Sequence, residues 1–508
     1  MNSNHGNKII AVNTMLLTVR MVFVMAIGLY STRIVLQVLG ASDYGIYNVV
    51  GGFVSMFAFI NTSMSNGIQR FYNFALGEND GRSLSKVFST AVRIQVIIAF
   101  AILFLIETVG IWYLKEKMVI PIERQEAALY CFQFSTMTMF ISVFQLPYIA
   151  LVMARERMNF YAIVSIIDAV LKLIIVVVLP YIAVDQLIIY GFLLMLISVV
   201  DFFLYFIYVK REFPNDVILV KSDKVLFKEM ISFSGWNCFG SFGVVMCNQG
   251  LNLILNFFFG TVVNAARGIA FQVAGACKSF VFNITTASRP QMTQSYAEGN
   301  VNRSISIMES MSKMCFVSLF VLALPIVIEL DFILEIWLGD SIPNYTKIFT
   351  MLVVAESLIS VFNPPISFMV HATGKMKRYQ LITTCVSLTS LPIAFVFLKF
   401  GMEPYSVFAV SIFFTILCQI VSVLILRSLI SFPIRKYFNH VVLPMIYVVI
   451  ASVLLPYIFH RLLQEGWWRL IVVSVASCIS LLVSSYLLGL NTSERTILVE
   501  LVKKRISE

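Results

Sequence analysis

The stretch from Asn264 to Asn300 reads NAARGIAFQVAGACKSFVFNITTASRPQMTQSYAEGN. Its first part is apolar enough to cross a membrane as a helix, and a polar segment follows from Pro290. Arg267 and Lys278 lie in the apolar part, and helical geometry places them on one face about 16 Å apart. A charge in hydrocarbon is costly and normally faces a protein interior or a wet cavity. The stretch therefore predicts a membrane helix that lines a polar cavity; snorkelling or structural pairing of the two charges is the alternative.

The composition agrees with a membrane protein. The chain has 508 residues, of which 59% are hydrophobic and 13% charged, and its mean hydropathy is +0.88. A soluble protein of this size has too little interior to bury so much apolar surface. The net charge of +10 could indicate nucleic acid, but in a membrane protein the position of basic residues matters more than their sum. We therefore expect no nucleic-acid partner.

The hydrophobic segments predict an all-α polytopic membrane protein with about 14 transmembrane helices. Cuts at Ala183–Gln186 and Gly260–Val263 separate apolar segments that are otherwise continuous. The predicted spans are 10–39, 44–66, 84–114, 124–153, 159–183, 186–209, 230–259, 262–288, 304–334, 345–371, 379–400, 404–427, 438–459 and 467–488.

Lys and Arg residues concentrate in the segments that are cytosolic if the N-terminus is inside. Residues 1–8 are polar and short, and no small-residue cleavage site follows the first apolar run, so we expect a retained cytosolic tail instead of a signal peptide. These patterns predict a multi-pass membrane protein with both termini in the cytosol.

Two parts of the chain resemble each other in sequence. Leu39-Gly40 begins a segment that resembles the one beginning at Phe259-Gly260, and Phe144-Gln145-Leu146-Pro147 resembles Phe362-Asn363-Pro364-Pro365 at nearly the same offset. Two matches at one offset favour a duplicated unit, which is a common construction of transporters; chance similarity between apolar segments is the alternative. Because the first copy contains six spans, the second enters with the same orientation, and the two copies are predicted to be parallel repeats.

The internal sequence similarity gives the predicted domain boundaries. We expect an N-lobe at 1–209, a cytosolic linker at 210–229, a C-lobe at 230–427, and two further helices with a cytosolic tail at 428–508. The proline motifs are predicted to break spans four and ten, as bending points for alternating access or as static kinks.

Ionisable residues within spans are candidates for function. Arg20 and Arg33 lie thirteen residues apart and point about 140° away from each other, so both cannot face one cavity from a straight helix. We favour Arg20 for the cavity, and place Arg33 at the outer mouth or snorkelling. Asp168 and Lys172 form an i, i+4 pair that is either a structural bridge or an ion site. Glu356 lies in the middle of span ten with no local partner.

Other polar residues have a plainer interpretation. Asp201 lies nearer the inner end of span six, and a structural role is favoured. Asn248 and Asn252 belong to a polar stripe on span seven. Helix–helix hydrogen bonding is the default explanation of this stripe, and contact with a sugar-bearing substrate is the more specific alternative.

Several chemistries are not supported. The eight cysteines all lie in spans without a C-x-x-C pair, so they indicate neither a disulfide framework nor a metal site. No P-loop and no nucleophile with a base can be recognised, so we expect no cofactor and no enzymatic activity.

Two stretches resemble a known superfamily. Arg33-x5-Leu39-Gly40-x3-Tyr44-Gly45-x-Tyr47 is similar to the amino-terminal signature of Wzx-type polysaccharide flippases, and Asn264-Ala265-Ala266-Arg267-Gly268-Ile269-Ala270, leading to Pro290-Gln291 and Ser295-Tyr296-Ala297, is similar to both those flippases and the MATE drug exporters. The chain thus resembles the multidrug/oligosaccharidyl-lipid/polysaccharide exporter superfamily over essentially its whole length.

The resemblance implies two six-helix lobes around a central cavity. In flippases this cavity is cationic and holds the diphosphate-sugar headgroup of an undecaprenyl-linked substrate. In related peptidoglycan-precursor flippases the last two helices form a groove for the lipid tail, and spans thirteen and fourteen are available for that role here.

We therefore predict a flippase that moves an undecaprenyl-diphosphate-linked oligosaccharide across the bacterial inner membrane by alternating access, for surface polysaccharide biosynthesis. The alternative is a MATE-like, ion-coupled exporter of small cationic molecules, which Asp168 and Glu356 would favour. Expected partners are membrane lipids, the lipid-linked glycan and polysaccharide polymerase machinery. The substrate-binding candidates are Arg20, Arg33, Arg267, Lys278, Asn248 and Asn252, and the ion-coupling candidates are Asp168, Lys172 and Glu356.

Overall fold

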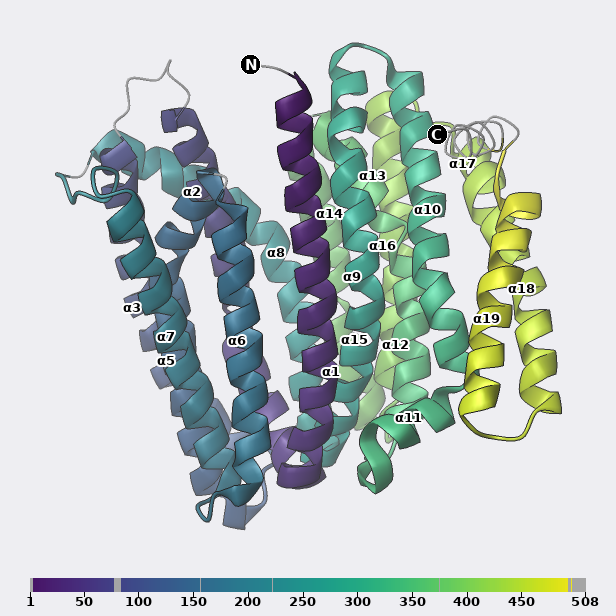
Figure 1. Ribbon diagram of the computed structural model, residues 1–508, viewed down its shortest axis with the longest axis horizontal. Coiled ribbons are helices and arrows are strands. Elements are labelled where there is room, and N and C mark those ends of the chain that lie inside the picture. Colours follow the sequence, from purple (N-terminus) through teal and green to yellow (C-terminus); the bar gives the residue numbers. More distant parts are fainter. Residues whose placement is uncertain are drawn as a thin grey trace. The chain divides into compact units, whose positions relative to one another are not determined.

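The protein is helical throughout its described part. The structure, a computed structural model, describes residues 3–76, 84–155, 157–221, 223–373, 375–491 and 495. These residues form nineteen α-helices joined by short turns, and no strand occurs among them (Figure 1). The predicted all-α fold class is therefore confirmed.

By compactness the chain divides into two units. Unit 1 comprises residues 1–268 and 391–407, and unit 2 comprises 269–390 and 408–508. Helices α8 and α2 pack together, which places α8 in unit 1 although the sequence assigned it to the C-lobe. Compactness does not test a repeat, so the predicted lobe boundaries stay a prediction.

Unit 1 contains the first eight helices, the first turns of α9 and most of α15. The bounds are α1 Ser3–Ser55, α2 Ala58–Leu76, α3 Leu84–Leu105, α4 Ile111–Glu116, α5 Gln125–Ala154, α6 Met158–Val178, α7 Gln186–Glu212, α8 Lys224–Phe259, α9 Thr261–Ala297 and α15 Ser390–Lys399.

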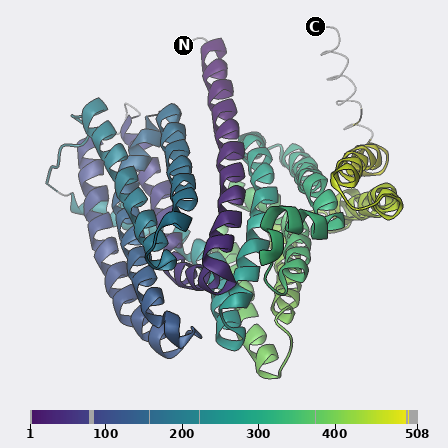
Figure 2. The same cartoon turned by 60° about the horizontal axis from the view of Figure 1, so that its bottom comes forward.

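Unit 2 contains the rest of α9 and the remaining helices, and α18 and α19 lie side by side as a hairpin (Figures 1 and 2). The bounds are α10 Val301–Ile328, α11 Leu330–Leu338, α12 Thr346–Ser360, α13 Asn363–Ala372, α14 Met376–Leu388, α16 Ser406–Ile430, α17 Ile434–Tyr437, α18 Leu443–Leu462 and α19 Trp467–Ser484.

Each unit has its own apolar core. In unit 1, Tyr72, Ile94 and Leu151 are fully or almost fully buried between α2, α3 and α5. In unit 2, Leu319 of α10 and Val448 of α18 belong to one buried cluster, so the C-terminal hairpin packs on α10. Between membrane helices such packing is stabilised by van der Waals contacts among close-packed side chains, because lipid tails are as apolar as the side chains themselves.

Glycines end two of the helices. Gly40 interrupts α1 with φ 74° and ψ 171°, and Gly260 separates α8 from α9 with φ 75°. The predicted cut at Gly260–Val263 is therefore confirmed. A second predicted cut, at Ala183–Gln186, coincides with the turn between α6 and α7.

The two proline motifs behave differently. Pro147 lies inside α5, which continues as one helix from Gln125 to Ala154, so the expected break of span four is absent. Span ten does break, because α12 ends at Ser360 and α13 begins at Asn363 with prolines in its first turn. Proline is well tolerated in a first turn, where its missing N–H has no intrahelical partner to lose.

The connection between α7 and α8 is tied to unit 1. Arg155 Nη2, just after α5, bonds Asp216 Oδ2 at 2.5 Å, and Arg93 Nη2 of α3 donates to the Val220 carbonyl oxygen at 2.8 Å. The helices extend into both ends of the predicted linker 210–229, since α7 runs to Glu212 and α8 begins at Lys224.

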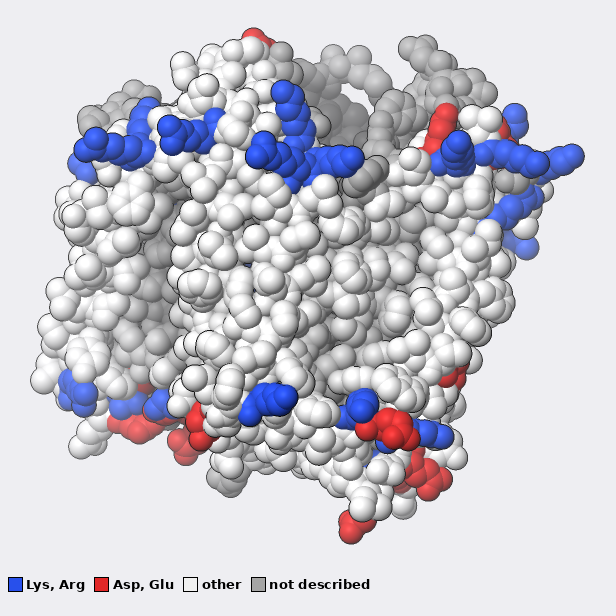
Figure 3. Space-filling model, turned by 180° about the vertical axis from the view of Figure 1, so that it is seen from behind, with Lys and Arg blue, Asp and Glu red and all other residues white. Residues whose placement is uncertain are grey.

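The protein is a multi-pass membrane protein. Twelve helical segments of the described part are long and apolar enough to cross a membrane. On the face drawn in Figure 3, Lys, Arg, Asp and Glu gather at the helix ends and leave a broad uncharged band between them. The upper edge is mostly blue and the lower edge mixes blue and red, as the positive-inside rule expects, but the cytosolic location of the termini stays a prediction.

Candidate functional site

Lys278 and Glu356 come together in unit 2. Lys278 lies near the middle of α9, which runs from Thr261 to Ala297, and its side chain is exposed. Glu356 of α12 is near enough for its charge to act on Lys278. Both were candidates from the sequence, which gave no reason to pair them.

Glu356 also has hydroxyl partners. Its Oε1 accepts hydrogen bonds from Ser411 Oγ at 2.8 Å and from Thr415 Oγ1 at 3.2 Å, both on α16. Ser411 and Thr415 are four residues apart and therefore share a helix face. Sequence analysis missed them, since serines and threonines are common in membrane helices and nothing local distinguishes these two. Unit 2 thus has a polar cluster of one ammonium, one carboxylate and two hydroxyls.

Arg267 is buried in the packing of α8 on α9. Its side chain belongs to unit 1, it is 6% exposed, and its Nη2 donates to the Asn248 carbonyl oxygen of α8 at 2.6 Å. This position satisfies the expectation that an intramembrane cation faces a protein interior. It also gives Arg267 a structural bond, so direct contact with a substrate stays a prediction.

The asparagines beside Arg267 form a buried network. Asn264 Nδ2 donates to both the carbonyl and the side-chain oxygen of Asn252 at 2.8 Å, and Asn256 Nδ2 donates to Asn264 Oδ1 at 3.2 Å. Asn252 is 3% exposed and also donates to the Asn48 carbonyl oxygen. These bonds fit the default explanation, helix–helix hydrogen bonding, for Asn252. Asn248, in contrast, has an exposed side chain.

A second cluster of charges lies between α6 and α7 in unit 1. Lys172 Nζ bonds Asp168 Oδ1 at 2.8 Å, as the i, i+4 spacing predicts. Asp201 of α7, for which the sequence favoured a structural role, lies within electrostatic range of both residues. Two carboxyl groups and one ammonium thus lie close together between these two helices.

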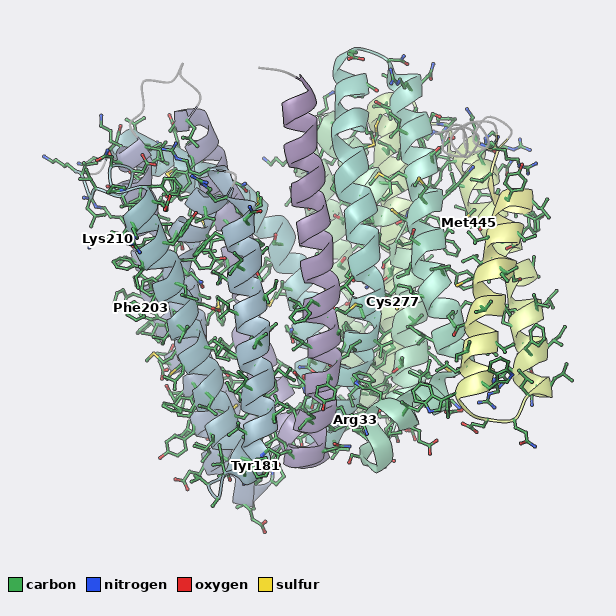
Figure 4. The ribbon with its side chains drawn as sticks, in the orientation of Figure 1. Arg33, Tyr181, Phe203, Lys210, Cys277 and Met445 are labelled. Atoms are coloured by element: carbon green, nitrogen blue, oxygen red, sulfur yellow. The ribbon has the colours of Figure 1, made fainter. Side chains whose placement is uncertain are left out.

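The two other cationic site candidates, Arg20 and Arg33, lie on α1. Arg33 is half-buried towards the lower end of α1 as drawn in Figure 4. The side chain of Arg20 lies outside the described residues. The roles of Arg20 and Arg33 as substrate contacts stay predictions.

An apolar groove borders the polar cluster in unit 2. It has a volume of about 650 Å³ and is lined by side chains of α10, α12, α16, α17 and α18. Among its lining residues only Gln419 and Tyr437 carry polar side-chain atoms. Met445 belongs to its wall on α18 (Figure 4). The groove is therefore suited to hydrocarbon, and the α18–α19 hairpin contributes to it through α18.

Each unit also has a network of ion pairs that joins the ends of neighbouring helices. In unit 1, Arg124 bonds Asp43, with Nε to Oδ1 at 2.8 Å, and also bonds Asp185, the N-cap of α7. Partial burial raises the pKa of the Asp185 carboxyl, but hydrogen bonds from Arg124 and from backbone N–H groups outweigh it and hold that pKa below its usual range. In unit 2, Glu329 bonds both Arg469 and His460.

Comparison with known proteins identifies the fold. No family model and no curated protein matches the sequence. Among solved structures, lipid II flippase MurJ in an inward closed conformation aligns with a TM-score of 0.69 and 13% identity, over 93% of this chain and 98% of that one. A multidrug resistance MATE family transporter of the MOP superfamily, inward-facing, aligns with a TM-score of 0.64 and 14% identity, over 81% and 94%.

A MATE transporter in a straight conformation aligns with a TM-score of 0.53 and 16% identity, over 84% of this chain and 96% of that one. The chain therefore has the fold of MOP-superfamily transporters, and the resemblance found in its sequence is confirmed at the level of the fold. At these identities the likeness does not identify a substrate.

Proposed function

We propose that this protein is a flippase that translocates an undecaprenyl-diphosphate-linked oligosaccharide across the bacterial inner membrane. One observation carries the proposal: unit 2 places a polar cluster and an apolar groove side by side on the same two helices. Glu356 and Ile359 lie three residues apart on α12, and Thr415 and Gln419 lie four residues apart on α16, so each pair shares a helix face; the first of each pair belongs to the cluster and the second to the groove. A site of this kind fits a ligand with a polar headgroup and a hydrocarbon chain.

Lys278 supplies the positive charge that a diphosphate needs, and Ser411 and Thr415 supply hydroxyl donors and acceptors for sugar. An ammonium forms charge-assisted hydrogen bonds with phosphate oxygens. The groove between α16 and α18 would take up part of the polyprenyl chain, in the role that the family resemblance implies for the last two helices. Arg20, Arg33, Arg267, Asn248 and Asn252 remain candidates for the headgroup path.

The test is transport in proteoliposomes. A polyprenyl-diphosphate-linked disaccharide labelled in its sugar is reconstituted with the full chain, and an impermeant reagent measures how much of the label changes leaflet. We expect translocation by the wild-type protein and a strong loss in Glu356→Gln/Lys278→Met. The variant Lys399→Met, outside the cluster, is the matched control and should transport normally. No translocation above that of empty vesicles would overturn the proposal.

The cluster of Asp168, Asp201 and Lys172 favours a second candidate, a MATE-like exporter of small cations driven by an ion gradient. Carboxyl groups within a membrane helix bundle are the usual means of coupling transport to protons. Efflux of a small cationic dye from the same vesicles, driven by a pH gradient and absent in Asp168→Asn, would select this function over the flippase.

A further inference from the structure

Gln419 is a polar residue in an apolar place. It lies on α16 and lines the groove, in which its neighbours along the helix, Ile416, Ile420 and Val423, are apolar. Both its amide nitrogen and its amide oxygen are buried, and neither has a hydrogen-bond partner among the described residues. A buried amide without a partner is unfavourable, because it gives up its bonds to water and gains nothing in return.

Water is a poor partner at this position. An ordered buried water needs two to four polar groups around it, and the groove offers only Gln419 and Tyr437. The Tyr437 hydroxyl is already used, since it donates to Ser312 Oγ at 3.4 Å. Gln419 lines the groove with its carbon atoms, and its amide lies directly beneath the wall. A ligand that brings its own polar atom into the groove would meet the amide once the side chain turns outward.

The position of Gln419 on α16 limits what that ligand can be. It lies thirteen residues after Ser406 and eleven before Ile430, so about 20 Å and about 16 Å separate it from the two ends of the helix. This is near the middle of a hydrocarbon core of about 30 Å. The ester oxygens of an ordinary phospholipid lie at the edge of that core, out of reach of the amide.

Gln419 also lies at the border between groove and polar cluster. Ser411, Thr415 and Gln419 follow each other at intervals of four residues, and so form one stripe along α16. The first two bond Glu356, and the third faces the groove. From Gln419 the groove continues towards Ile434, at the predicted cytosolic end, because α17 and the start of α18 follow the end of α16.

We infer that the Gln419 amide binds the oxygen that joins the headgroup of the substrate to its hydrocarbon chain, the first phosphoester oxygen of a polyprenyl diphosphate. This inference rests on the proposed function. It implies an arrangement in which the headgroup occupies the polar cluster at mid-membrane while the chain still lies in the half of the groove that leads to the cytosolic end. The headgroup thus crosses the middle of the membrane before its chain does.

Binding and stability together test this role. The full-length protein in detergent is titrated with undecaprenyl diphosphate, and separately with phosphatidylglycerol, for the wild type and Gln419→Leu. We expect Gln419→Leu to bind undecaprenyl diphosphate about tenfold more weakly, the loss expected for one hydrogen bond to a charged group. Without lipid, the variant should melt at the same temperature as the wild type or higher, because an unpaired buried amide is gone.

The control variant is Phe413→Leu, an exposed residue of α16 that does not line the groove, which should leave binding of undecaprenyl diphosphate and of phosphatidylglycerol unchanged. Unchanged binding in Gln419→Leu would overturn the inference while leaving the proposed function intact. A lower melting temperature of the lipid-free variant, or an equal loss of phosphatidylglycerol binding, would also overturn it, because the amide would then be structural or a general lipid contact. Failure of the wild type to bind undecaprenyl diphosphate would instead overturn the proposed function.

Discussion

Gly40 and Gly260, which are 220 residues apart in the chain, have almost the same backbone conformation. Their φ angles are 74° and 75°, and their ψ angles are 171° and −167°. This region of backbone space is essentially restricted to glycine. Each glycine interrupts the chain between two long helical segments. The two glycines also occupy matching positions at the start of the two similar sequence segments. The shared geometry is what a duplicated structural unit would retain.

Alanine at either glycine should therefore destabilise the protein. We expect Gly40→Ala and Gly260→Ala each to lower the free energy of unfolding by about 1–3 kcal/mol through backbone strain. A Cβ at Gly40 would meet no atom within 4 Å, so crowding does not contribute there. Gly51→Ala, in a helical part of α1 and equally open, is the control and should be neutral or slightly stabilising. Thermal unfolding in detergent measures all three, and equal melting temperatures would contradict the strain argument.

The orientation of the chain can be tested with single cysteines. Glu116 ends α4 and Lys221 lies before α8, and both side chains are exposed. In intact cells an impermeant maleimide should label Glu116→Cys, while Lys221→Cys should react only after the membrane is opened. The background must lack Cys385 and Cys478, whose side chains are also exposed. Labelling in the reverse order would refute a cytosolic N-terminus.

Asp168 and Lys172 should behave as a coupled pair. In an Asp201→Asn background, which removes the third charge of the cluster, Asp168→Asn leaves Lys172 without a carboxylate partner, whereas Asp168→Asn/Lys172→Met removes both charges of the bridge. Because an unpaired charge in the membrane is the costly state, the double variant should be more stable than the single one. A double-mutant cycle on unfolding should give a coupling of at least about 0.5 kcal/mol.

The exposed bridge between Lys347 and Asp331 offers the comparison for this cycle, and its coupling should be close to zero. If the double variant at Asp168 and Lys172 were less stable than either single variant, the two residues would have separate roles.

How far the sequence predicted these sites depends on the kind of contact. Spacing along one helix was sufficient for the bridge between Asp168 and Lys172, and glycine identified the break at Gly260. The partners of Glu356 come from α16, more than fifty residues later in the chain, and no pattern in span ten indicates them. Helical periodicity fixes the face on which a residue lies, but not which other helix packs against that face.

The same limit applies to Arg267 and Lys278. Periodicity correctly placed both on one stretch of α9, and from the sequence Arg267 was the first candidate for the substrate. Its bond to the Asn248 carbonyl is set by the packing of α8, which one-dimensional spacing does not contain. Because Arg267 is buried, it also has a structural role. Of the two cations on α9, Lys278 is the exposed one.

Substitutions at Arg267 and at Lys278 should therefore have different effects on stability and on transport. We expect Arg267→Ala to lower the melting temperature together with transport, because the Asn248 carbonyl loses its donor, and Arg267→Lys to recover only part, since an ammonium lacks the guanidinium fork. Lys278→Ala should keep a normal melting temperature and lose transport. Unfolding and flipping measured on the same preparations would separate the two effects. Normal stability with abolished transport in Arg267→Ala would instead favour direct contact of Arg267 with the substrate.

Glu329 should hold the C-terminal hairpin to the rest of unit 2. Its side chain is fully buried where α10 meets α11, and it bonds Arg469 of α19 at 2.8 Å and His460 of α18 at 2.7 Å. Glu329→Gln would leave Arg469 buried without this counter-charge. We expect a loss of about 3–5 kcal/mol in the free energy of unfolding, the usual result of removing one partner of a buried ion pair.

Replacing both partners should recover much of that loss. Glu329→Leu/Arg469→Leu leaves no buried charge, and apolar replacements of buried ion pairs are often well tolerated. The control is Glu465→Gln, because Glu465 lies 3.6 Å from Arg469 but is half exposed, and its loss should change stability by less than about 1 kcal/mol. Since α18 lines the apolar groove, flipping should decline in Glu329→Gln and return in the double variant, and a double variant as unstable as Glu329→Gln would show that the hairpin needs the ions themselves.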